Sequence, residues 1–134
     1  MIVEDSADVQ HLLKATFHGS SYKLTTVPNA EEAREQLQQH VFDIIILDIA
    51  LPGDDGLVLC SELQTNKNAR SSHVIVLSGD ANVSQKVVAF SMGADDYIVK
   101  PFSPLELRAR IAARLMKTYH QAQQNEQNFK KTGT

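Results

Sequence analysis

The sequence lacks tryptophan, contains a single cysteine, Cys60, and has no long uninterrupted apolar run. One cysteine excludes an internal disulfide, and a membrane-spanning helix needs about 20 consecutive apolar residues. The net charge of -3 disfavours nucleic acid or an anionic membrane as a direct partner of this segment. No basic segment leads into an apolar one at the start, so we expect no secretory signal and a cytoplasmic protein.

Length and composition predict one folded domain followed by a short tail. A chain of 134 residues with 43% hydrophobic content can bury one core but is short for two domains. From residue 120 onward the sequence turns to Gln, Asn and Lys. We therefore expect a domain over 1–119 and, over 120–134, either an extension of the last helix or a linker.

Short apolar runs alternate along the chain with segments that have the spacing of amphipathic helices. Helix starts are marked by Ser6, by Asn29 with Glu32 three residues later, and by Ser103 followed by Pro104. The expected strands are 1–3, 22–27, 43–47, 73–77 and 97–99, and the expected helices begin near residues 6, 29, 57, 83 and 103. The apolar positions of the first helix include Val9, Leu12, Leu13 and Phe17, and the apolar side of the last helix, formed by Leu107, Ile111 and Leu115, is expected to face the sheet. This alternation predicts an α/β fold with a doubly wound parallel sheet of five strands and five flanking helices.

Polar side chains directly follow four of the expected strands. The apolar run Ile44-Ile45-Ile46-Leu47 ends in Asp48, and the other strand ends are followed by Glu4 and Asp5, by Ser78 and by Lys100. The carboxyl ends of parallel strands meet at one edge of the sheet, where open α/β sheets bind ligands. We therefore expect these side chains to converge.

Three converging carboxylates require compensation by positive charge. Two like charges about 4 Å apart repel by about 4 kcal/mol at an effective dielectric near 20. Lys100 and a divalent cation are the natural compensation. A site that offers a small number of protein oxygen ligands together with a phosphate oxygen suits Mg²⁺. The pattern predicts a site that handles a phosphoryl group.

Each of these residues also has an ordinary structural explanation when it is taken alone. Asp48 fits a turn after a buried strand, and Glu4 and Asp5 would favour the start of the first helix. Ser78 fits a strand-end hydroxyl, and Tyr97 on the last strand fits simple packing. Their joint presence favours the phosphoryl site.

The ordered set of motifs resembles the receiver domain of two-component response regulators, over about residues 1–119. The matching motifs are Glu4-Asp5, then Asp48 with Pro52, Gly53 and Gly56, then Ser78-Gly79, then Gly93-Ala94-Asp95-Asp96-Tyr97-Ile98-Val99-Lys100-Pro101-Phe102. The resemblance implies a flavodoxin-like sheet of order 2-1-3-4-5. It also implies a phosphorylation-dependent signalling switch rather than an enzyme acting on other substrates.

The resemblance assigns roles to the clustered carboxylates. Asp48 would be the phosphoryl acceptor and would accept from a histidine kinase or a histidine phosphotransfer protein. Glu4, Asp5, Asp48 and the backbone carbonyl of Ala50 would hold Mg²⁺, or Mn²⁺ in its place. Catalysis would be limited to phosphorylation and dephosphorylation of Asp48 itself.

The remaining roles belong to the fourth and fifth strand ends. Lys100 would neutralise the transferring oxygens, and a cis bond between Lys100 and Pro101 would turn the lysine toward the site. Ser78 would donate its hydroxyl to the phosphoryl group, and Tyr97 would rotate inward behind it. These two residues would change the surface around the fourth helix, fifth strand and fifth helix, and so control an output domain or effector protein.

Two other functions fit an α/β sheet with this edge. A flavodoxin-like electron carrier would need a phosphate-binding loop after the first strand, and Glu4-Asp5-Ser6 would repel that phosphate. A Mg²⁺-dependent phosphatase with an aspartyl nucleophile would typically need an acid two residues later, where Ala50 lies. In the receiver family, the positions of Ala50 and Asp80 tune the lifetime of the phosphoryl group.

The resemblance also suggests a homodimer through the face formed by the fourth helix, fifth strand and fifth helix. By our alignment, the similar DNA-binding subgroup carries a charged pair where this chain has Val88 and Ser91. We therefore expect a more apolar contact on the same face.

Overall fold

The computed structural model describes residues 1–51 and 55–132, and the predicted Pro52 and Gly53 motif positions lie outside them. The strands are β1 (Ile2–Val3), β2 (Thr26–Val27), β3 (Ile44–Asp48), β4 (His73–Ser78) and β5 (Asp96–Val99). The helices are α1 (Ala7–Thr16), α2 (Ala30–Gln39), α3 (Asp55–Leu63), α4 (Val83–Ser91) and α5 (Pro104–Thr132). All four strand pairings are parallel, in the order β2-β1-β3-β4-β5. The predicted flavodoxin-like fold is confirmed.

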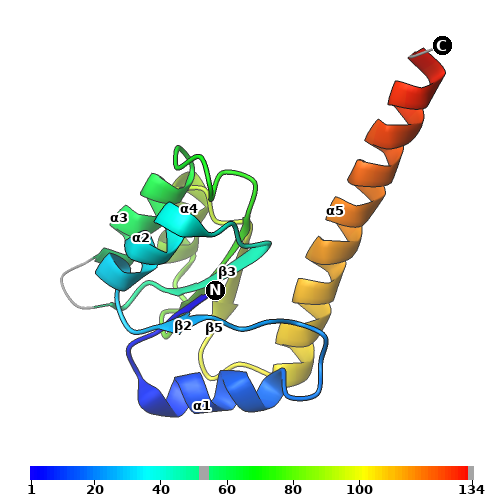
Figure 1. The fold of residues 1–134 in the computed structure, drawn as a ribbon. Helices are drawn as coiled ribbons and strands as arrows, with labels where there is room; N and C mark the ends of the chain where they lie inside the picture. The colour runs from blue at the N-terminus through cyan, green and yellow to red at the C-terminus, as the bar shows by residue number, and fades with distance from the viewer. Residues whose placement is uncertain (52–54, 133–134) are drawn as a thin grey trace.

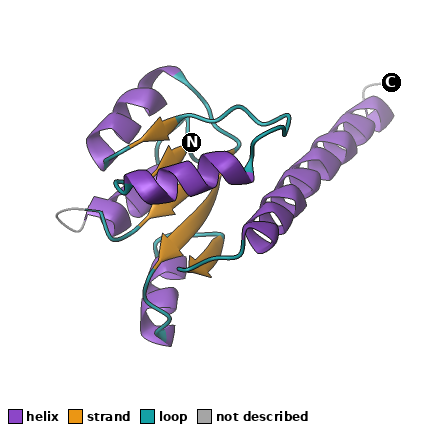
Figure 2. Ribbon diagram, turned by 90° about the horizontal axis from the view of Figure 1, so that it is seen from below, coloured by secondary structure: helices purple, strands orange, loops and turns teal. Residues whose placement is uncertain are grey.

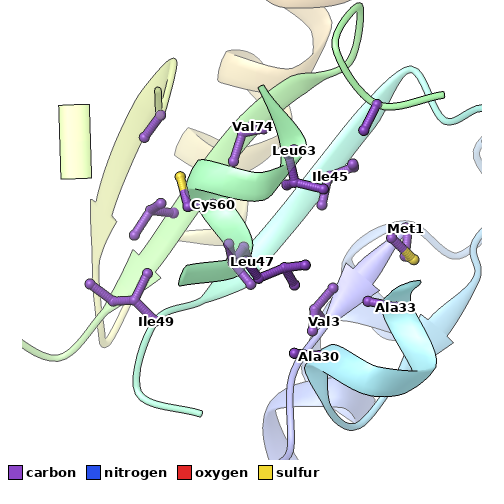
Figure 3. Close-up of a cluster of buried hydrophobic side chains, with 14 of the residues drawn as sticks. Met1, Val3, Ala30, Ala33, Ile45, Leu47, Ile49, Cys60, Leu63 and Val74 are labelled. Atoms are coloured by element: carbon purple, nitrogen blue, oxygen red, sulfur yellow. The ribbon is translucent and has the colours of Figure 1, made fainter. Parts of the chain in front are cut away.

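Two layers of buried hydrophobic side chains cover the sheet, one on each face. Figure 2 shows the helices that surround the strands. Side chains of β3 alternate between them, so that Ile45 and Leu47 join the layer under α2 and α3 (Figure 3). Ile46 points the other way and packs with Leu13 of α1 and Leu107 of α5. Because β3 and β4 are covered on both faces, their sequences are almost continuously apolar.

Local signals place the helix ends where the sequence predicts them. The Ser6 side chain accepts a hydrogen bond from the Val9 amide, and the Asn29 side chain accepts one from the Glu32 amide. Gly93, just beyond α4, has φ 105°, a left-handed conformation that favours glycine. These caps satisfy backbone groups that a helix leaves unpaired.

In α1, Val9, Leu13 and Phe17 supply the inner face, and Leu12 is 44% exposed. One expectation for this part of the chain is wrong. The predicted strand over 22–27 forms only at Thr26 and Val27, because β1 offers it only Ile2 and Val3 as partners.

Helix α5 runs unbroken to Thr132 and extends well beyond the sheet (Figure 1). Its base is held by Arg110 and Arg114, which both form ion pairs with Asp96 of β5 at 2.8 and 3.0 Å. Further along, the Thr118 hydroxyl lies 2.6 Å from His73 Nε2 at the start of β4. Within residues 1–51 and 55–132, no helix combines the length and hydropathy required to cross a membrane.

Candidate phosphoryl-transfer site

Asp48 is the last residue of β3, at the carboxyl edge of the sheet between β1 and β4. Its side chain is almost completely buried, although it is polar. Its Oδ1 accepts a hydrogen bond of 2.9 Å from the Ala50 amide, while Oδ2 faces Lys100. The buried strand therefore holds the carboxylate in one orientation.

Glu4 and Asp5 follow β1 directly and lie beside Asp48. One oxygen from each of the three carboxylates falls within 4.8 Å of the others. Glu4 is 1% exposed, whereas Asp5 is open to solvent. This cluster of carboxylate oxygens fits Mg²⁺, which prefers oxygen ligands. The exposure of one carboxylate also fits, because bound Mg²⁺ keeps several of its water ligands.

The Lys100 ammonium lies between two of these carboxylates, 3.1 Å from Glu4 Oε2 and 3.3 Å from Asp48 Oδ2. The peptide bond between Lys100 and Pro101 is cis. The sequence predicts Lys100 at this edge but does not predict that Glu4 is its nearest partner, because the pairing depends on side-chain geometry and β1 and β5 are not neighbours in the sheet.

Burial and charge act in opposite directions on this ion pair. Burial raises the pKa of Glu4, and the neighbouring Asp48 charge adds to that rise, while the hydrogen bond from Lys100 opposes it. Burial lowers the pKa of Lys100, but Glu4 and Asp48 together outweigh it and the net shift is upward. Lys100 is therefore firmly charged, and three carboxylates against one ammonium leave negative charge that a divalent cation would neutralise.

Ser78 and Tyr97 meet at the loop that follows β4. Ser78 is buried, and its Oγ accepts a hydrogen bond of 3.0 Å from the Asp80 amide. Tyr97 is also buried, and its hydroxyl donates to the Asp80 carbonyl at 2.6 Å. The resemblance pointed to Asp80 only as a position that tunes the lifetime of the phosphoryl group, whereas in the structure its backbone contacts both Ser78 and Tyr97.

Comparison with known proteins shows the family to which the chain belongs. The model of the response regulator receiver domain family matches residues 1–112. The phosphate regulon transcriptional regulatory protein PhoB of Rhizobium meliloti (strain 1021) is 36% identical over 114 residues, covering 85% of this chain and 50% of PhoB. The chain belongs to the response regulator receiver domain family.

Solved structures show the same fold. The receiver domain of the Francisella response regulator 1452 is 26% identical, with a TM-score of 0.79, covering 87% of this chain and 95% of that one. NtrX from Brucella abortus is also 26% identical, with a TM-score of 0.79, covering 99% of this chain and 29% of NtrX. The chain thus spans about half of PhoB and less than a third of the NtrX chain. The matches support neither a flavodoxin nor a phosphatase.

Proposed function

We propose that this receiver domain is a phosphorylation-dependent switch whose acceptor is Asp48. One observation carries the proposal: a buried aspartate at a strand end touches a lysine and shares its surroundings with two further carboxylates. The proposed donor is a histidine kinase or a histidine phosphotransfer protein, and the proposed recipient of the signal is an output domain or effector protein. The proposed compartment is the cytoplasm, where the single thiol of Cys60 stays reduced.

In the proposed reaction, a carboxylate oxygen of Asp48 attacks the phosphorus of the donor. The new oxygen–phosphorus bond forms as the phosphorus–nitrogen bond of the donor phosphohistidine breaks, and the electron pair returns to the imidazole. Lys100, already 3.3 Å from Asp48 Oδ2, would neutralise charge on the transferring oxygens. Glu4, Asp5 and Asp48 would hold a Mg²⁺ ion, which would add further neutralisation.

The readout follows from the contacts of Ser78 and Tyr97. Because Ser78 Oγ accepts from the Asp80 amide, its own hydroxyl hydrogen is left to donate to a phosphoryl oxygen. A phosphoryl group brings about 1.5 to 2 negative charges next to Ser78 and Lys100. We infer that the phosphoryl group would draw the loop at Asp80 toward the site. This movement would reach Tyr97, because the Tyr97 hydroxyl donates a hydrogen bond to the Asp80 carbonyl.

Removal of one metal ligand tests the site directly. Asp5→Asn is expected to weaken Mg²⁺ binding by about 10-fold or more while the melting temperature stays unchanged, because Asp5 is exposed. Titration calorimetry with Mg²⁺ measures the affinity. Asp8→Asn is the matched control, since it removes the same charge three residues along on exposed α1 surface. Equal affinities in the two variants would contradict the proposed metal site.

We propose further that phosphorylation favours a homodimer through α4, β5 and α5. The exposed apolar side chains on α4 support a partly apolar contact, and they are Val83, Val87, Val88 and Phe90. Val88→Glu is expected to weaken dimerisation by about 10-fold, because it buries a charge in that contact. Sedimentation velocity after phosphorylation measures the dimer, with Val58→Glu on exposed α3 surface as control. A dimer unchanged by Val88→Glu would exclude this surface.

A further inference from the structure

The acidic turn Glu4-Asp5-Ser6 begins where the backbone pairing between β1 and β2 ends. The Glu4 amide donates to the Val27 carbonyl at 3.0 Å, and β2 goes no further than Val27. The Glu4 carbonyl lies beyond this pairing and accepts its hydrogen bond from a side chain, the Nε2 amide group of Gln10. Because Glu4 is almost completely buried, its carbonyl needs such a partner.

Gln10 holds this turn on both sides of Asp5. Its side chain donates to the Glu4 carbonyl, and its backbone amide donates to the Ser6 carbonyl at 3.0 Å. Asp5 lies between these two bonded residues. A single residue of α1 therefore fixes the backbone on either side of an exposed carboxylate that belongs to the candidate metal cluster.

The side chain of Gln10 is not required to cap α1. The Ser6 hydroxyl already accepts from the Val9 amide at 3.3 Å, and the Ser6 carbonyl accepts from the Gln10 backbone. Gln10 is half-buried and lies three residues before Leu13, which places the two side by side on the helix. From this position its side chain reaches back past the helix start to Glu4. The bond therefore supports the acidic turn rather than the helix end.

Asp5 depends on this support more than the other two carboxylates of the cluster. The Glu4 carboxylate is held by the Ser6 amide at 3.2 Å and by Lys100 at 3.1 Å. Lys100 also holds the Asp48 carboxylate, at 3.3 Å. Within the described part of the chain, the Asp5 carboxylate has no hydrogen bond or ion pair of its own. Its direction toward the cluster is therefore set by the backbone to which it is attached.

We propose that Gln10 is a positioning residue of the metal site and keeps the Asp5 carboxylate directed at the ion. This inference rests on the proposed Mg²⁺ site of Glu4, Asp5 and Asp48, and it names the residue that pre-organises that site. Groups that orient metal ligands typically strengthen metal binding by about 10-fold to 100-fold. The neutral amide of Gln10 suits this place, because it donates to the Glu4 carbonyl without adding a positive charge near the cation.

The test compares the Mg²⁺ affinity of the unmodified chain with those of Gln10→Met and Gln10→Asn. Methionine has nearly the length of glutamine but no donor, and asparagine keeps the amide but is too short to reach Glu4. Each variant is expected to bind Mg²⁺ about 10-fold more weakly. The melting temperature should fall by only a few degrees. Titration with Mg²⁺, followed by the NMR shift of the Ala50 amide, measures the affinity, and Gln38→Met on exposed α2 surface is the matched control.

A double-mutant cycle separates the positioning of Asp5 from a general effect on the fold. In the Asp5→Asn background, Gln10→Met is expected to change the Mg²⁺ affinity by less than about 2-fold, because the ligand that it positions is already lost. A full additional loss in that background would overturn the proposal, as would unchanged affinities in Gln10→Met and Gln10→Asn. Asp5→Asn alone tests the metal site. If it leaves the affinity unchanged, the proposed metal site fails, whereas a loss in Asp5→Asn without one in Gln10→Met refutes only the role of Gln10.

Discussion

Asp48→Asn is expected to abolish formation of an acyl phosphate when the protein is incubated with acetyl phosphate and Mg²⁺. An amide oxygen is a far weaker nucleophile than a carboxylate, and among the described carboxylates Asp48 alone combines burial at the end of the central strand with a contact to Lys100. Intact mass spectrometry of the adduct, with its lability in base, measures the loss.

The fold should survive this substitution. The side-chain amide introduced by Asp48→Asn would still offer an oxygen to the Ala50 amide, and the loss of charge would relieve the repulsion between Asp48 and Glu4. The melting temperature is therefore expected to be equal or higher. Asp43→Asn is the matched control, because Asp43 is an exposed aspartate just before the same strand. An adduct that persists in Asp48→Asn, or disappears in Asp43→Asn, would refute the assignment.

Gly56→Ala is expected to destabilise the domain by about 3 kcal/mol, a fall in melting temperature of about 10 °C. A Cβ at Gly56 would lie 2.4 Å from the Cα of Ile49 and 2.7 Å from its carbonyl oxygen. Both atoms belong to the backbone, so the clash cannot be relieved by a side-chain rotation. Thermal melting followed by circular dichroism measures the effect.

The same clash should disturb the site, because Ile49 directly follows Asp48. Gly56→Ala is therefore expected to slow phosphorylation by acetyl phosphate even at temperatures where the variant is folded. Gly79→Ala is the control, since a Cβ there meets nothing within 4 Å. Its melting temperature should change by only a few degrees. Similar losses in both variants would show that the contact with Ile49 is unimportant.

Much of the fold was predictable because its signals are local. Ser6 and Asn29 cap their helices through hydrogen bonds that span three residues, and the apolar run before Asp48 marks a strand that is covered on both faces. The length of β2 was not predictable in this way. Whether residues 22–25 form a strand depends on the partner strand, and that information lies elsewhere in the chain.

The candidate site was likewise predictable from the sequence only in part. The topology alone brings Asp48, Glu4 and Lys100 to one edge, so their proximity followed from the strand order. The choice of Glu4 as the nearer partner of Lys100 depends on side-chain geometry and burial, which no periodicity encodes. Ser78 and Tyr97 both form hydrogen bonds with the Asp80 backbone. These contacts likewise could not be predicted from the sequence, because they depend on the conformation of the loop.

The long helix α5 has a mechanical consequence. The segment from Arg114 to Thr132 spans about 27 Å at about 1.5 Å per residue, and its anchor on Asp96 lies next to Tyr97 in the chain. A tilt of about 10° at that anchor would move Thr132 by about 5 Å by the geometry of a rigid rod. A displacement of β5 too small to disturb the core would therefore be amplified along α5 into a movement that is large on the scale of a side chain.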